Sequence, residues 1–173
     1  MEVAFLLMVS AILSPQTQPT GATDADLWTA AVEQVRRDLQ VQNQGELVIL
    51  NQTIPTAELR PLSADAMRET RLFGLLRKRN DSTRTAITGI RLPPRTRLVE
   101  ANSVQNWEEF SNRFPRAKLV RFSLPAFSED GVKAIVYYSA TGGFDDSQGA
   151  YMIFEMMKNG QWLVRDYLGM WIT

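Results

Sequence analysis

Two adjacent carboxylates, Asp145 and Asp146, lie near the middle of the segment GGFDDSQGA, which spans 142–150. A carboxylate pair can act as general acid and base, or supply oxygen ligands to Ca²⁺. Neighbouring side chains usually point apart, however, and the segment lacks the ligand spacing of an EF-hand. Glycines and short polar side chains are typical of a hairpin loop, here of about six to nine residues. We therefore interpret the segment as a turn and keep both aspartates as candidates for ligand binding.

A second group of candidates is aromatic. Because strand side chains alternate, one residue of the pair Tyr137 and Tyr138 must leave the core face. Aromatic surface is then expected to cover a cleft between helices and a curved sheet, although core packing is the competing interpretation. The complete set of candidate ligand-binding residues is Trp107, Tyr138, Asp145, Asp146, Tyr151 and Tyr167.

The chain contains no cysteine and no histidine. The usual protein ligands of zinc, haem, iron–sulfur clusters and copper are therefore missing. The base of the Ser-His-Asp and Cys-His mechanisms is missing as well. We predict no catalytic residue, no metal site and no cofactor. The catalytic alternative is a hydrolase with two converging carboxylates, drawn from Asp145, Asp146, Glu108, Glu109 and Asp166.

The formal net charge is zero, but the charges are unevenly distributed. Residues 60–97 contain ten Lys or Arg and three Asp or Glu, a net of +7, whereas residues 1–59 have a net of −5. Such clustering could bind a phosphate backbone, which makes a cytosolic nucleic-acid binder the second alternative. Its candidates are Arg77, Lys78, Arg79 and Arg84. The competing interpretation is the solvated face of a helix, since no aromatic platform is interleaved with them.

The N-terminal residues 3–13, VAFLLMVSAIL, form an apolar run with a single serine. The run is too short to span a bilayer but fits the apolar core of a secretory signal peptide, and the small residues at 20–22 suit a cleavage site. Glu2 stands where a basic residue is usual, which leaves a buried strand or helix as the alternative. We predict a signal peptide over 1–22 and a single domain over 23–173. The mature chain is then secreted or periplasmic, without a transmembrane anchor.

Regular elements are expected from the periodicity of the apolar residues. Spacings of three and four predict helices over 24–39, 64–79 and 103–114. Short apolar runs predict strands at 46–52 and 85–92, the second of which is stopped by two prolines.

The C-terminal third predicts an antiparallel meander. Four runs rich in β-branched and aromatic residues are separated by turn signals. The pair Asn159 and Gly160 predicts a two-residue type I′ turn before the last strand. Alternation along that strand predicts one apolar face, formed by Trp162, Val164, Leu168, Met170 and Ile172. The expected fold class is α+β, with the N-terminal helices packed on one face of the C-terminal meander.

The same region contains short motifs that resemble the end of a group of uncharacterised, mostly exported bacterial proteins. That group has a Phe-x-x-Asp-Gly turn, a glycine-rich loop, an Asn-Gly-x-Trp hairpin and a Trp-Ile-Ser-like terminus. The matching positions are Phe127, Asp130, Gly131, Asn159, Gly160, Trp162, Trp171 and Ile172. The segment NWEEFSNRFP resembles the preceding helix, so that the resemblance covers 105–173.

One departure from the group concerns its glycine-rich loop. Members often carry Cys-Gly pairs there, whereas this chain has Thr141-Gly142 and Gln148-Gly149. The resemblance implies export and a fold, and it implies no activity. Together with the residues above, it predicts an exported, non-catalytic module that binds an unknown small ligand or protein. Nucleic acid is not expected as a partner.

Overall fold

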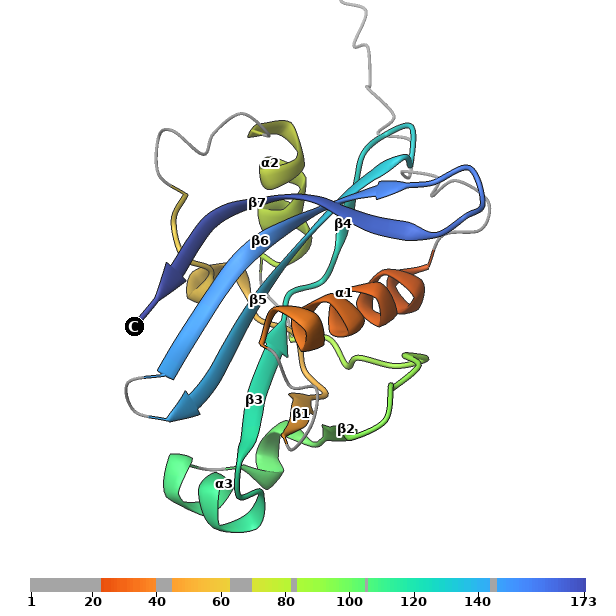
Figure 1. Ribbon diagram of the computed structural model, residues 1–173. Coiled ribbons are helices and arrows are strands. Elements are labelled where there is room, and N and C mark those ends of the chain that lie inside the picture. Colours follow the sequence, from red (N-terminus) through yellow and green to blue (C-terminus); the bar gives the residue numbers. More distant parts are fainter. Residues whose placement is uncertain (1–22, 40–44, 63–69, 82–83, 105, 144–145) are drawn as a thin grey trace, which may run out of the picture.

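The computed structural model describes residues 23–39, 45–62, 70–81, 84–104, 106–143 and 146–173 (Figure 1). The expected signal peptide, the first part of the expected second helix and Asp145 lie outside these residues. The described chain contains a seven-stranded sheet with the order β2-β1-β3-β5-β6-β7, and β4 pairs separately with β5. The strands are β1 Glu46–Leu50, β2 Thr96–Val99, β3 Ala117–Phe122, β4 Ala126–Phe127, β5 Lys133–Gly143, β6 Asp146–Met156 and β7 Trp162–Ile172.

The expected α+β class is confirmed: the helices precede a largely antiparallel C-terminal sheet. Among the described strands, only the pairs of β1 with β2 and with β3 are parallel. The chain therefore passes from β1 to β3 through a long connection that contains α2 and α3. A parallel pair requires such a crossover, because its strands start at the same edge of the sheet.

The helices cover both faces of the sheet, which differs from the expected single face. Helix α1, Asp24–Asp38, packs on one face, whereas α2, Thr70–Arg79, and α3, Trp107–Arg113, pack on the other. Figure 1 shows α1 and α2 on opposite sides of the long strands. The cause is visible in β5 and β6, where the consecutive residues 134–138 and 150–154 are all buried. Strands with apolar residues of both parities need cover on both faces.

The first helix begins and ends close to its expected bounds. Thr23 and Asp26 form a capping box, in which each side chain accepts a hydrogen bond from the other residue's backbone N–H. Such a box satisfies two of the free N–H groups at a helix start. On the buried side of α1, the indole of Trp28 donates to the carbonyl oxygen of Ser123 at 3.0 Å. Helix α1 is thereby fixed to the segment that joins β3 and β4.

The middle of the chain departs from the expected pattern. Residues 85–92 form no strand and contribute one isolated bridge, between Gln52 and Ala86. The strand β2 instead follows the two prolines, because Pro94 and Arg95 form a turn that places the next residues beside β1. The third helix is shorter than expected and begins at Trp107, where Asn106 caps it by accepting a hydrogen bond from the Glu109 N–H at 2.9 Å.

In the connection between β6 and β7, three residues lie between the hydrogen-bonded Met157 and Gln161, and the predicted two-residue type I′ turn is wrong. Met157 accepts a hydrogen bond from the Gly160 N–H at 2.9 Å, and the Met157 N–H donates to the Gln161 carbonyl at 2.8 Å. Gly160 has a φ of +80°, but Asn159 does not have a positive φ. A type I turn followed by a left-handed glycine needs only one positive φ, so a single glycine is sufficient.

The segment GGFDDSQGA belongs largely to strands. Strand β5 continues to Gly143 and β6 starts at Asp146, which leaves only residues 144 and 145 between them. The expected loop of about six to nine residues is therefore too long. Gly149 has a packing role, because a Cβ there would lie 2.5 Å from the Tyr138 carbonyl oxygen and 2.8 Å from the Trp171 indole nitrogen.

Strand β7 does not keep one apolar face. Its pairing with β6 slips at Arg165 and again nearer its end. Because one extra residue reverses the alternation, Trp162 packs on the α1 side and Leu168 on the α2 side. Met170 and Ile172 are 60% and 72% exposed. The predicted common face is wrong for this reason.

Candidate functional site

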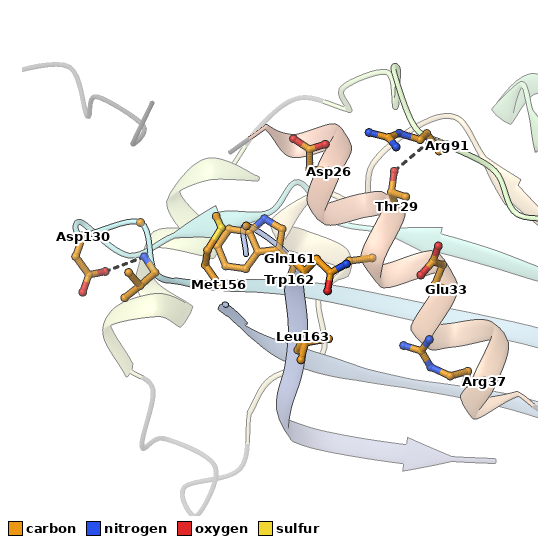
Figure 2. Close-up of a pocket in the computed structure, with 14 residues that line it drawn as sticks. Asp26, Thr29, Glu33, Arg37, Arg91, Asp130, Met156, Gln161, Trp162 and Leu163 are labelled. Atoms are coloured by element: carbon orange, nitrogen blue, oxygen red, sulfur yellow. Dashed lines mark hydrogen bonds between the residues drawn. The ribbon is translucent and has the colours of Figure 1, made fainter. Parts of the chain in front are cut away.

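A groove of about 720 Å³ lies between α1 and the hairpin that joins β6 and β7. Its walls are the polar side of α1, residues 156–163 of the hairpin, and the turn 130–132 between β4 and β5; Arg91 adds a further side chain (Figure 2). Three segments that are far apart in the sequence therefore meet at one surface depression.

The floor of the groove is largely apolar. Trp162 is 7% exposed and packs against Phe127, with ring centroids 5.8 Å apart. Met156 lies beside it, while Val132 in the turn and Leu163 on the hairpin are 45% and 42% exposed. Large exposed apolar side chains within a concave surface are typical of a binding site.

The indole N–H of Trp162 donates to no residue in the described part of the chain. Every fully buried side-chain nitrogen or oxygen among the described residues has a partner, so the unpaired N–H of Trp162 must be accessible to solvent, and Trp162 lines the groove. A Trp side chain that is otherwise buried usually has its N–H paired. The groove floor thus presents an available hydrogen-bond donor among apolar side chains.

The α1 wall is charged because helical spacing brings its polar residues to one side. Asp26, Thr29, Glu33 and Arg37 recur at intervals of three and four, and Figure 2 shows them along the helix opposite the hairpin. Asp26 is engaged in the capping box, and Arg37 donates to the Gln34 side chain at 2.6 Å.

Two charged groups at the groove are unpaired. Among the described residues, the carboxylate of Glu33 and the guanidinium of Arg91 have no hydrogen-bond or ion-pair partner. The backbone N–H of Arg91 is fixed by the Thr29 hydroxyl at 3.1 Å, which anchors the Arg91 loop to α1. The rim therefore offers one anion and one cation to a ligand.

The turn that closes one end of the groove is organised by Asp130. Its Oδ1 accepts hydrogen bonds from the Ser128 hydroxyl at 2.6 Å and from the Val132 N–H at 3.1 Å. Both hydrogen bonds favour the ionised carboxylate and hold the pKa of Asp130 below its usual value, and the bond from the Ser128 hydroxyl has the larger effect. Gly131 has a φ of +69°, which suits glycine. Asp130 thus stabilises the conformation of this turn.

The five candidate residues that the structure describes lie outside the groove, and they do not form one site. Tyr138 and Tyr167 lie on the α1 side of the sheet. Burial raises the pKa of both phenols, and the hydrogen bond from the Tyr167 hydroxyl to Asp38, at 2.6 Å, raises that of Tyr167 further. Tyr138 has its hydroxyl beside the Gln148 amide, which donates to it at 3.4 Å.

Tyr151 and Trp107 lie on the opposite face, in separate clusters. Tyr151 is fully buried and donates to the carbonyl of Arg60, and burial raises its pKa. Trp107 packs on Phe110 with ring centroids 5.1 Å apart. Core packing accounts for Tyr138 and Tyr151, and helix packing accounts for Trp107.

The four described carboxylates of the hydrolase alternative do not converge. Asp146 forms an ion pair with Lys118. Glu108 and Glu109 are exposed on α3, whereas Asp166 lies on β7. None of these four lines the groove. Asp145 lies outside the described residues.

The positive charge of residues 60–97 is partly neutralised by acidic side chains from residues 1–59. Arg79 pairs with Asp24 at 2.9 Å, and Arg84 pairs with Glu58. The uneven distribution of charge along the sequence therefore becomes a set of ion pairs in the fold. Arg77 and Lys78 remain exposed on α2.

The sequence contained a usable signal for the groove. The polar residues of α1 at intervals of three and four marked one face, and the Asp130-Gly131 and Gly160-x-Trp162 turns were recognised separately. Nothing in the sequence indicated that these turns meet beside α1, because β4 to β7 must first form the sheet that joins them.

Among the described residues, no group of Asp and Glu side chains is arranged to hold a metal ion, and no helix is long and apolar enough to cross a membrane. No protein-family model matches the chain, and no match was found among curated proteins or solved structures.

Proposed function

We propose that the protein is an exported, non-catalytic module that binds a small ligand or a peptide segment in the groove between α1 and the β6–β7 hairpin. The observation that carries this proposal is the free indole N–H of Trp162 within an apolar floor. The volume of the groove, about 720 Å³, is within the usual range for ligand sites.

The side chains of the groove suggest the chemistry of the ligand. Leu163 and Val132 would contact an apolar body, and the indole of Trp162 would donate to a carbonyl or carboxylate oxygen. Arg91 and Glu33 would then pair with a negative and a positive end. A short peptide with free ends has all of these features, and an N-acetylated amino-acid amide keeps the apolar side chain and the carbonyl oxygens.

Export remains part of the proposal and rests on the apolar run 3–13 followed by small residues. Intact mass of the protein from its native host, measured together with cell fractionation, tests it. Loss of the first 22 or so residues in an extracytoplasmic fraction is the expected result. The full-length chain in the cytosol would contradict export and leave the groove proposal standing.

Binding can be tested with a set of N-acetylated amino-acid amides and free dipeptides that carry aromatic or branched side chains. Two-dimensional ¹H–¹⁵N spectra follow the indole resonance of Trp162, and we expect it to shift with a saturable dependence on concentration. The variant Leu163→Asp places a charge on the apolar floor and should weaken binding by about tenfold or more.

Ile172→Asp is the matched control, because Ile172 lies on the same strand, is 72% exposed and does not line the groove. It should bind like the unmodified protein. Equal losses in both variants, or ligand shifts confined to residues outside the groove, would contradict the proposal.

A further inference from the structure

A second depression lies where the three parallel strands begin. Strands β2, β1 and β3 start side by side at Thr96, Glu46 and Ala117. The residues before and after these starts line an open depression of about 690 Å³, formed by Gly45, Glu46, Arg95, Thr96, Arg97, Pro115 and Arg116. None of these residues lines the groove beside α1.

The lining is strongly basic. Three arginines and one glutamate contribute, a net charge of +2. Arg97 pairs with Glu46, whereas the side chain of Arg116 has no partner among the described residues. Arg36 of α1 approaches from the side, where its guanidinium donates to the Pro94 carbonyl and lies 3.4 Å from the Thr96 hydroxyl. Several guanidinium groups are thus gathered around one depression with a single carboxylate among its lining residues.

Two of the arginines have a backbone conformation that is unfavourable for them. Arg95 and Arg116 have φ values of +57° and +67°, and each immediately precedes a strand of the pocket. No other described non-glycine residue has a positive φ. Left-handed backbone crowds a Cβ atom, so glycine is the usual residue at such positions. Arginine in this strained conformation at two positions of one pocket favours a role for its side chain.

We propose that this pocket binds an oxyanion of the phosphate class, as a free anion or as part of a small phosphorylated molecule. The planar guanidinium donates two parallel hydrogen bonds to such oxygens. Arg116 would be the principal contact because it has no competing partner. Arg97 would contribute its remaining donors, and the Thr96 hydroxyl one further hydrogen bond.

The backbone conformation gives a test that separates binding from stability. Arg116→Gly removes the guanidinium and also the crowded Cβ atom. We expect the melting temperature to stay equal or rise, while affinity for the anion falls. If the Arg116 side chain served only the structure, Arg116→Gly would lower the melting temperature and leave the affinity for the anion unchanged.

The probe is inorganic pyrophosphate, titrated by calorimetry and by ¹H–¹⁵N spectra, with sodium chloride at matched ionic strength as the reference. Resonances of Gly45, Thr96 and Arg116 should shift, and Arg116→Gln should weaken binding by about tenfold or more, since a hydrogen bond to a charged group contributes about 1.5–3 kcal/mol. Arg77→Gln is the control with the same charge change, because Arg77 is exposed on α2 and outside the pocket. It should leave the affinity within about twofold, as expected for a distant exposed charge.

Inorganic phosphate and adenosine monophosphate, titrated in parallel, distinguish the two sources of the anion. Tighter binding of the nucleotide would indicate that the pocket takes a phosphorylated molecule, and equal binding would indicate the free anion. The proposal is overturned if pyrophosphate shifts the same resonances no more than chloride does. It is also overturned if Arg116→Gln and Arg77→Gln lose affinity equally.

Discussion

The buried side chain of Asn80 is expected to be among the most sensitive positions of the fold. Asn80 is 1% exposed and lies just after α2. Its amide nitrogen donates to the carbonyls of Leu76 at 2.8 Å and Leu124 at 3.0 Å, and its oxygen accepts from the Leu124 N–H at 2.8 Å. It thereby joins α2 to the segment between β3 and β4, which leads to Phe127 beneath the groove.

The magnitude for Asn80→Ala follows from the groups that lose a partner. The Leu76 carbonyl still accepts the backbone N–H of residue 80 at 3.1 Å. Both polar backbone groups of Leu124 lose the partner that Asn80 provides, and an unsatisfied buried group costs about 1–3 kcal/mol. We therefore expect the free energy of unfolding to fall by about 2–6 kcal/mol.

Urea unfolding followed by circular dichroism measures this change, with the slope of the transition compared between variants. Asn112→Ala is the control, because Asn112 is exposed on α3, and it should change stability by less than about 0.5 kcal/mol. Asn80→Asp keeps an acceptor for the Leu124 N–H but places a second oxygen opposite the carbonyls of Leu76 and Leu124, where the amide nitrogen donated. This variant should therefore lose at least as much free energy of unfolding as Asn80→Ala. A loss below about 1 kcal/mol for Asn80→Ala, under an unchanged slope, would refute the reasoning.

Three further predictions concern packing, turn geometry and pH. Gly149→Ala should lower the free energy of unfolding by about 1–3 kcal/mol, because the new methyl overlaps the Tyr138 carbonyl; thermal unfolding should show it, and an unchanged melting temperature would contradict the packing. Gly160→Ala should cost about 1–2 kcal/mol, since its φ is +80° and nothing obstructs a Cβ there; a stability equal to that of the unmodified protein would argue against the three-residue turn. Burial raises the pKa of every tyrosine, so the unfolded state releases these protons first and stability should fall as pH rises above about 10. Absorbance of the phenolate band should therefore rise together with unfolding. Gradual ionisation while the protein stays folded would contradict this prediction. The tyrosines concerned are Tyr137, Tyr138, Tyr151 and Tyr167.

Local signals in the sequence determined the elements whose causes are themselves local. The apolar spacing within 24–39 was sufficient to predict α1, and the capping box of Thr23 and Asp26 that begins the helix is also a local contact. The β-branched and aromatic runs were sufficient to predict β5, β6 and β7, and with them the α+β class.

Tertiary structure decided everything that depends on contacts between distant segments. Strand β2 has a weak pattern of its own and exists because β1 offers it a parallel edge. The face of each β7 residue was set by slips in its pairing with β6, and a shift by one residue reverses the alternation on which sequence patterns rely.

The binding surfaces show the same division. The sequence supplied the residue types, including the turn at Asp130 and the hairpin at Trp162, but it did not place them together beside α1. Aromatic residues chosen for their type, such as Tyr138 and Tyr151, were needed in the core. Charges that look clustered along the chain were paired across it, as Arg79 is with Asp24. Local sequence thus determined which segments form helices and strands, and only long-range packing determined which side chains remain available to a ligand.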